Sequence, residues 1–273
     1  MFKITVDDLK DKAYNLRYNL IELLYKTGSG HLDTSLSLVE IWLSIVYGNQ
    51  YRFDPDNGSM LERDRIFLSE GHACPLQYLI NADLGYYNKE EVFDGLRQPF
   101  SPFQGHSIRN LDYGIENSNG SLGIGLWQAY GNALDSDSTV YCIAGDGEFQ
   151  EPLSLSIFAA ATNLRPAGNF VVLVNNNGLT QDSKIDLGPL LKVANSYDWQ
   201  TYSVDGHSFS AIGEAIQSSA DISDKPSIII CKTVKGKDGD PALAGKLGSH
   251  GRPPKTEEEY LAHIDGLKQS RRN

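Results

Sequence analysis

Two short apolar runs, each followed by a polar turn that contains glycine, most constrain how this chain can fold. The first covers residues 140–144 and precedes Gly145-Asp146-Gly147-Glu148; the second covers residues 170–174 and precedes Asn175-Asn176-Asn177-Gly178. Runs that are apolar throughout are typical of strands buried on both faces of a parallel sheet. Because ligands bind at the carboxyl ends of such strands, we expect Asp146 and Asn177 to lie side by side there.

The oxygen donors of these two turns suit a hard divalent cation. One carboxylate, one side-chain amide and a nearby backbone carbonyl fit a Mg²⁺ ion whose other ligands are water and the oxygens of a diphosphate. The glycines leave the backbone bare, so a bulky anion can approach it. A Gly-Asp-Gly triplet alone is also common in solvated turns, so the pairing with the second turn is what favours a metal and diphosphate site.

Apolar periodicity predicts strands that alternate with helices along the chain. This alternation implies right-handed βαβ crossovers and an α/β fold, a doubly wound and mostly parallel sheet with helices on both faces. We expect residues 1–273 to form a single domain, with 235–273 as a C-terminal loop and helix. The expected strands are 65–69, 140–144, 170–174, 201–204 and 227–232, and the expected helices are 7–26, 35–47, 75–85, 89–96, 120–134, 151–163, 187–197, 209–220 and 256–268.

Composition excludes several classes of protein. A net charge of −11 and a pI near 5.0 argue against a nucleic-acid-binding surface, which needs a basic stripe. No apolar stretch approaches the roughly 18 residues of a membrane helix, and the charged N-terminus does not resemble a secretory signal. The three cysteines, an odd number, read as reduced core residues, and we expect a cytoplasmic protein; they are Cys74, Cys142 and Cys231.

Four of the six histidines stand in glycine-containing motifs. A lone loop histidine is usually just solvated, but four in such motifs favour function, since histidine titrates near neutral pH and can donate to anionic oxygens. The irregular stretch 99–119 is long for a compact domain, which also favours function. We expect His207 and His263 to be structural. The motifs are Ser29-Gly30-His31, Glu70-Gly71-His72, Gly105-His106 and Ser249-His250-Gly251.

Taken in order, these motifs resemble the N-terminal, diphosphate-binding part of the transketolase family, in the form split into two polypeptides. The resemblance runs from Gly28 to about Gly251 and includes Leu96-Arg97-Gln98, Gly114-Ile115-Glu116 and the glycine-rich stretch 120–125. It implies thiamine diphosphate and Mg²⁺ as cofactors. It also implies a transferase that moves a two-carbon ketol unit from a ketose or ketose phosphate to an aldehyde acceptor.

The resemblance assigns roles to individual residues. Asp146 and Asn177 would ligate Mg²⁺ through their side chains and Leu179 through its backbone carbonyl. His31 and His106 would bond the oxygens of the sugar and move protons at its carbonyl. The implied cofactor-binding set is His72, Gly120, Leu122, Gly123, Gly145, Asp146, Gly147, Glu148, Asn177 and His250, and the implied catalytic set is His31, His72, His106, His250 and Glu151.

Several features qualify these roles. Glu151 would belong to a carboxylate network between two active sites, or would be an N-terminal charge on its helix. Asp33, Glu70 and Arg97 are further candidates for substrate contact. Pro152 replaces the family's usual glycine, and Leu32-Asp33-Thr34 replaces a small, glycine-bearing stretch, so the departures concern the substrate more than the cofactor.

The family activates the thiamine ring with a glutamate from a second, pyrimidine-binding domain, which does not fit after residue 251. We therefore expect a C-terminal, pyrimidine-binding transketolase subunit as partner in an α₂β₂ heterotetramer. The expected substrate is a sugar or sugar phosphate, and no nucleic acid or membrane partner is expected. The alternatives are another thiamine diphosphate-dependent carboligase or synthase subunit, a 2-oxoacid dehydrogenase α subunit, or a non-catalytic partner-binding subunit. The histidine set favours sugar chemistry, and the Asp146/Asn177 pair speaks against a scaffold.

Overall fold

A five-stranded parallel sheet forms the centre of the computed structural model, which describes residues 2–164, 167–221 and 224–272. All four pairs of neighbouring strands are parallel, so the predicted doubly wound α/β class is confirmed. Each predicted strand is present, with ends within two residues of the prediction. In sheet order the strands are β1 (Arg65–Leu68), β2 (Val140–Gly145), β3 (Phe170–Asn176), β5 (Ser227–Lys232) and β4 (Gln200–Asp205).

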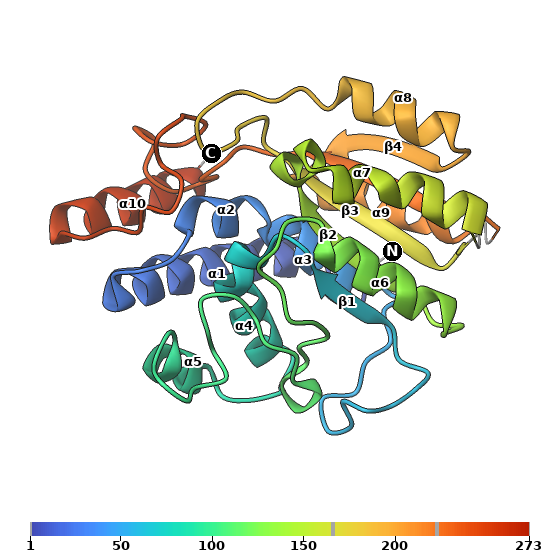
Figure 1. The fold of residues 1–273 in the computed structure, drawn as a ribbon. Helices are drawn as coiled ribbons and strands as arrows, with labels where there is room; N and C mark the ends of the chain where they lie inside the picture. Colours follow the sequence, from blue (N-terminus) through green and yellow to red (C-terminus); the bar gives the residue numbers. More distant parts are fainter. Residues whose placement is uncertain (1, 165–166, 222–223, 273) are drawn as a thin grey trace.

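Helices cover both faces of this sheet and bury a hydrophobic core on each (Figure 1). Successive residues of β2 point to opposite faces: Tyr141 and Ile143 join one core, whereas Cys142 and Ala144 join the other. This explains why the strand sequences are apolar throughout rather than alternating. The first core includes α1 (Val6–Thr27), α3 (Val39–Val46), α4 (Cys74–Asp83) and α9 (Phe209–Ala220), and the second includes α6 (Ile124–Leu134), α7 (Pro152–Ala159) and α8 (Gly188–Ser196).

Two predicted helices differ from the prediction at places that matter for the site. The helix expected over 35–47 is two helices, α2 (Leu32–Ser37) and α3, so it begins earlier and His31 stands just before its first turn. The helix expected over 120–134 begins only at Ile124, because Gly120 and Gly123 have φ angles of 146° and 82° that a helix does not allow.

The remaining helices follow the prediction more closely. The helix expected over 151–163 is α-helical only to Ala159 and continues as a π-helical turn, Ala160–Leu164. The others are α5 (Lys89–Gly95) and the C-terminal α10 (Glu257–Ser270). Within the described ranges, no helix is long and apolar enough to span a bilayer. All three cysteines are free and buried, as predicted.

The strand register brings the polar turns together at one edge of the sheet. Gly145 of β2 pairs with Asn175 of β3, which in turn pairs with Cys231 of β5. The segment that leaves β5 continues beside this edge, since the Thr233 amide donates to the Asn176 carbonyl (2.9 Å). Three neighbouring strands therefore deliver their carboxyl ends to the same place, which is where ligands bind in such sheets.

Candidate active site

The turns after β2 and β3 are joined by hydrogen bonds to one carboxylate. Asp146 accepts from the backbone amides of Gly178 (2.7 Å) and Gly147 (2.8 Å). Asn177 Oδ1 accepts from the amide of Leu179 (3.0 Å). The three expected metal ligands, Asp146, Asn177 and Leu179, line a single cleft of about 330 Å³. The structure thus places them together, as the sequence predicts.

The chemistry of these donors fits a magnesium ion that is shared with a diphosphate. Burial raises the pKa of Asp146 to about 6, and a dication beside the carboxylate would reverse this by favouring its ionised form. The backbone amides of Gly147 and Gly178 donate to different carboxylate oxygens of Asp146, and a carboxylate has about four acceptor sites in all. In the part of the chain that is described, no group of three or more His, Cys, Asp or Glu side chains could hold a metal. A single carboxylate suits an ion that takes its other oxygens from an amide, a carbonyl, water and a diphosphate.

Three of the four motif histidines form a cluster beside this turn. The ring centroids of His31, His72 and His250 are 4.8, 4.9 and 5.2 Å apart. They come from the start of α2, from the 3₁₀ turn Gly71–Ala73 after β1, and from the loop before α10. His106 is exposed and borders the same region, since a Cβ atom on Gly71 would lie 3.0 Å from its ring. Three chain segments far apart in the sequence thus supply one histidine site.

The imidazoles of this cluster are held in the neutral form. Burial is the main cause that lowers the pKa of His31 to about 4, and the neighbouring His250 and Arg97 contribute to the same value. Burial likewise lowers the pKa of His72 well below its usual value and lowers the pKa of His250. Among the described residues, the buried Nδ1 atom of His31 has no hydrogen-bond partner. A neutral ring with a free nitrogen can accept a proton from a ligand hydroxyl.

The low pKa of His31 predicts a difference in acid stability between the parent chain and a His31→Phe variant. The unfolded state protonates this histidine near pH 6.5, but the folded state does so only near pH 4, so acidification between these values favours unfolding. The parent should therefore lose stability relative to the variant between these pH values. The carboxyl groups with raised pKa values affect the stability of parent and variant alike. Urea unfolding at several pH values measures the difference. Parallel stability curves would contradict the assignment.

Two buried glutamates brace the strand ends. Glu148 accepts from Ser69 Oγ (2.6 Å), Gly145 N (2.8 Å) and Gly123 N (2.9 Å), so it ties β1, β2 and the 120–123 turn together. Glu70 accepts from Asn175 Nδ2 (3.1 Å), and burial raises its pKa well above the usual value. Both line the cleft, but their carboxyl groups are engaged with the protein, which suits a positioning role.

Of the remaining sequence candidates, Leu122 lines the cleft, whereas Gly120 and Glu151 are not among its lining residues. Leu122 is 42% exposed and lines the cleft, and Gly120 has open space where a side chain would be, so both leave room for a flat ring. Glu151 is exposed and stands at the N-cap of α7. This place is compatible with a charge that stabilises the helix dipole and with a contact across an interface.

Lys235 is the residue of this site that the sequence reasoning missed. It is only 2% exposed, and its Nζ atom lies 3.4 Å from His250 Nδ1 in the wall of the cleft. Burial lowers the pKa of this amine, whereas Asp33, Asp146 and Glu70 raise it. A buried cation among these groups prepares the cleft for an anion. A sequence signal for it was weaker than for Asp146, because Lys235 stands three residues after the end of β5 whereas Asp146 directly follows β2.

Comparison with known proteins agrees with this geometry. The family model described as "Transketolase, thiamine diphosphate binding domain" matches residues 10–268. The 6-deoxy-6-sulfo-D-fructose transketolase subunit SqwG of Clostridium sp. (strain MSTE9) is 34% identical over 272 residues, with 95% of this chain and 96% of the relative covered. Transketolase 2 of Escherichia coli is 30% identical, with 93% of this chain but only 40% of the relative covered.

A comparison with solved structures also matches this chain to part of a longer transketolase. A crystal structure of transketolase from Campylobacter jejuni superposes with a TM-score of 0.86 at 28% identity, covering 98% of this chain and 43% of that one. The chain therefore spans about two fifths of the longer transketolases and nearly all of the Clostridium subunit.

Proposed function

Since this chain belongs to the transketolase family through its thiamine diphosphate-binding domain, we propose that it is the N-terminal subunit of a two-component transketolase. The enzyme would transfer a two-carbon ketol unit from a ketose or ketose phosphate to an aldehyde. The observation that carries the proposal is the contact among His31, His72 and His250 beside the Asp146–Asn177 turn.

Residues in and around the cleft would bind each part of the cofactor. Asp146, Asn177 and the Leu179 carbonyl would hold Mg²⁺, whereas His72, His250 and Lys235 would face the diphosphate as donors. The bare backbone at Gly145 and Gly147 would lie against it, the Gly120 carbonyl would accept from the aminopyrimidine, and Leu122 would support the ring. Thiamine diphosphate supplies an electron sink for breaking the carbon–carbon bond.

The histidines would transfer protons to and from the sugar. His31 is neutral at physiological pH and has a free nitrogen, so it can accept a hydroxyl proton and return it. His106 is exposed next to it and would hydrogen-bond a sugar oxygen. Burial of His31 and His72 helps to exclude water from the reacting atoms.

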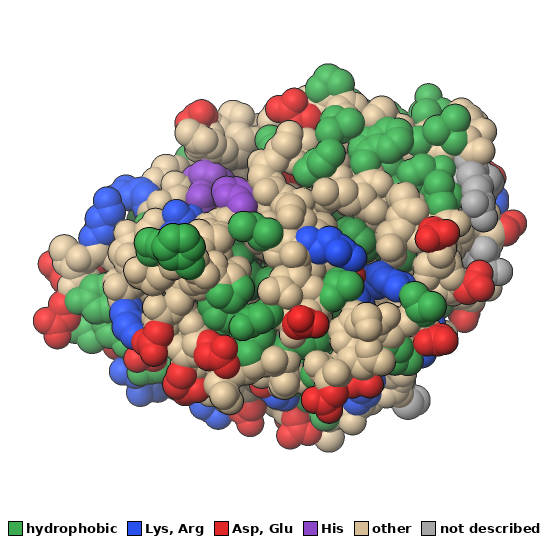
Figure 2. All heavy atoms as spheres, turned by 60° about the horizontal axis from the view of Figure 1, so that its bottom comes forward, with side chains coloured by type: hydrophobic (Ala, Val, Ile, Leu, Met, Phe, Trp, Pro, Cys, Tyr) green, Lys and Arg blue, Asp and Glu red, His purple; other side chains and the backbone are tan. Residues whose placement is uncertain are grey.

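The partner would be a C-terminal, pyrimidine-binding subunit in an α₂β₂ assembly. Large apolar side chains are exposed at the cleft rim and on α7 and its π-helical end, and Figure 2 shows hydrophobic side chains gathered on the face that also shows histidine. Such a patch is typical of an interface. Glu151 would lie within this contact. Three free cysteines suit a cytoplasmic setting. The exposed residues are Leu122, Leu153, Leu155 and Leu164.

Donor choice tests the proposal against its rivals. With a pyrimidine-binding transketolase subunit, Mg²⁺ and thiamine diphosphate, the chain should transfer a ketol unit from a ketose phosphate or a sulfonated ketose to an aldehyde. Chromatography of the products measures this transfer. The second donor is chosen because the Clostridium relative is named for a sulfonated fructose. Turnover of a 2-oxoacid alone would favour a synthase or dehydrogenase, and cofactor binding without any turnover would favour a non-catalytic subunit.

A further inference from the structure

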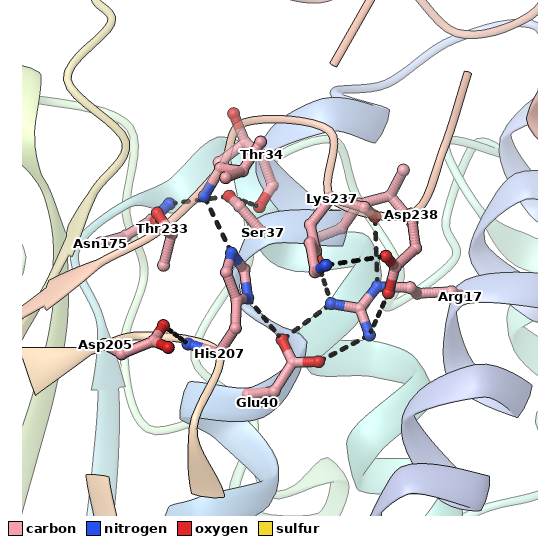
Figure 3. A network of polar contacts seen from close by, with 12 residues as sticks. Arg17, Thr34, Ser37, Glu40, Asn175, Asp205, His207, Thr233, Lys237 and Asp238 are labelled. Atoms are coloured by element: carbon pink, nitrogen blue, oxygen red, sulfur yellow. Dashed lines mark hydrogen bonds and ion pairs between the residues drawn. The ribbon is translucent and has the colours of Figure 1, made fainter. Parts of the chain in front are cut away.

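A polar network around Arg17, Glu40 and His207 lies beside the segment that leaves β5 (Figure 3). Arg17 of α1 is 2% exposed and donates to both carboxylate oxygens of Glu40 in α3, each at a distance of 2.7 Å. His207, which follows β4, lies 3.0 Å from Glu40 through Nδ1. Three helix and loop segments are thereby joined through one carboxylate, and none of these residues lines the cleft.

The hydrogen bonds of His207 fix its tautomer. Its Nε2 accepts from the backbone amide of Val234 (2.8 Å), so the proton is on Nδ1, which donates to Glu40. Burial raises the pKa of Glu40, but Arg17 and His207 outweigh it and lower the pKa to about 2. The carboxylate is therefore charged and holds the ring in one orientation.

The same network fixes the segment of residues 233–238, which we call the β5 exit segment. Its amides at Val234 and Gly236 donate to His207 and to the Asp33 carbonyl (2.9 Å). Arg17 Nε donates to the Lys237 carbonyl (3.2 Å), and its guanidinium lies 3.6 Å from the Asp238 carboxylate. The residue between these anchors is Lys235.

We propose that Arg17, Glu40 and His207 are positioning residues, which hold the β5 exit segment so that the Lys235 ammonium stays beside His250 in the cleft. The meaning of Lys235 for the cofactor rests on the proposed function. A lysine has a flexible four-carbon stem, so the place of its charge depends on the backbone that carries it. Without the bond to His207, the Val234 amide loses its acceptor and the Lys235 side chain gains freedom to leave the diphosphate site.

The test replaces His207 while leaving the Arg17–Glu40 pair intact. His207→Phe removes the acceptor for Val234, whereas the Gln side chain of His207→Gln can still accept from that amide. In the complex with the partner and Mg²⁺, calorimetry should show thiamine diphosphate binding about tenfold weaker for Phe, the low end for loss of a supporting hydrogen bond at a ligand site. The Gln variant should bind like the parent. If the Phe variant does not fold, His207→Leu carries the same test.

A double-mutant cycle shows whether the effect passes through Lys235. On a Lys235→Met background, His207→Phe should cause no further loss of affinity. A matched control is His263→Phe, because His263 also accepts a backbone amide, that of Asp240 (2.9 Å), but outside the exit segment. An additive loss in the cycle, or an equal loss in the control, would overturn the proposal.

Amide hydrogen exchange gives a second readout that needs no cofactor. His207→Phe should speed exchange at Val234 and Gly236, and His207→Gln should not. Unchanged exchange in the Phe variant would overturn the positioning role. If the parent complex fails to bind thiamine diphosphate, the proposed function is wrong, and the exchange result still decides whether His207 holds the segment.

Discussion

Replacing Asp146 by alanine is expected to abolish Mg²⁺-dependent binding of thiamine diphosphate. Asp146 is the one carboxylate in the proposed ligand set, and it also holds the amides of Gly147 and Gly178 in place. Its loss removes the only ligand charge and loosens the turn that carries Asn177. Calorimetry on the complex with its partner should show affinity lowered by more than about 100-fold, equivalent to at least ~2.7 kcal/mol.

A matched control separates this effect from a general loss of charge. Asp182 also lines the cleft but is exposed, so Asp182→Ala should bind the cofactor nearly as the parent does. Because burial raises the pKa of Asp146 to about 6, the metal must displace a proton below that pH, and parent affinity should fall on acidification. Unchanged cofactor affinity in Asp146→Ala would remove this residue from the metal site.

The parts of the site that the sequence predicts are those fixed by strand position. A parallel sheet presents its carboxyl ends at one edge, so finding the runs before Gly145 and Asn175 was enough to place Asp146 next to Asn177. The family motifs pointed to His31, His72 and His250 one by one, but their separation along the chain contains no information on their contact, which only the structure shows. The break between α2 and α3 escaped prediction, since apolar residues continue across it at Leu36, Leu38 and Val39.

Long-range polar pairing could not be predicted from the sequence. Glu148 stands in the metal-turn motif, yet its carboxylate reaches Ser69 and Gly123, contacts that depend on the packed tertiary structure. His207 fits no site motif, and its link from Glu40 to Val234 joins residues 167 and 27 positions away. Lys235 was assigned to a C-terminal loop because the stretch 235–254 is rich in Gly, Pro and Lys.

The chain alone is expected to lack transketolase activity. Each buried glutamate of the described residues already has a partner, so none of these four is free to activate a thiamine ring. Glu40 pairs with Arg17, Glu116 with Arg63, Glu70 with Asn175, and Glu148 with Ser69 and two backbone amides. These 273 residues also span only about two fifths of the longer transketolases. The proposal therefore takes the activating group from another polypeptide or domain.

Assays of the purified chain, with and without a pyrimidine-binding transketolase subunit, test this expectation. With excess thiamine diphosphate and Mg²⁺, ketol transfer from a ketose phosphate should appear only in the mixture, because the cofactor on the lone chain would be held at its diphosphate end and left unactivated. The exposed leucines at the cleft rim and on α7 should make the isolated chain self-associate, and light scattering should show this decreasing when the partner is added. Robust turnover by the lone chain would mean that it supplies its own activating group, and the two-component proposal would then be wrong.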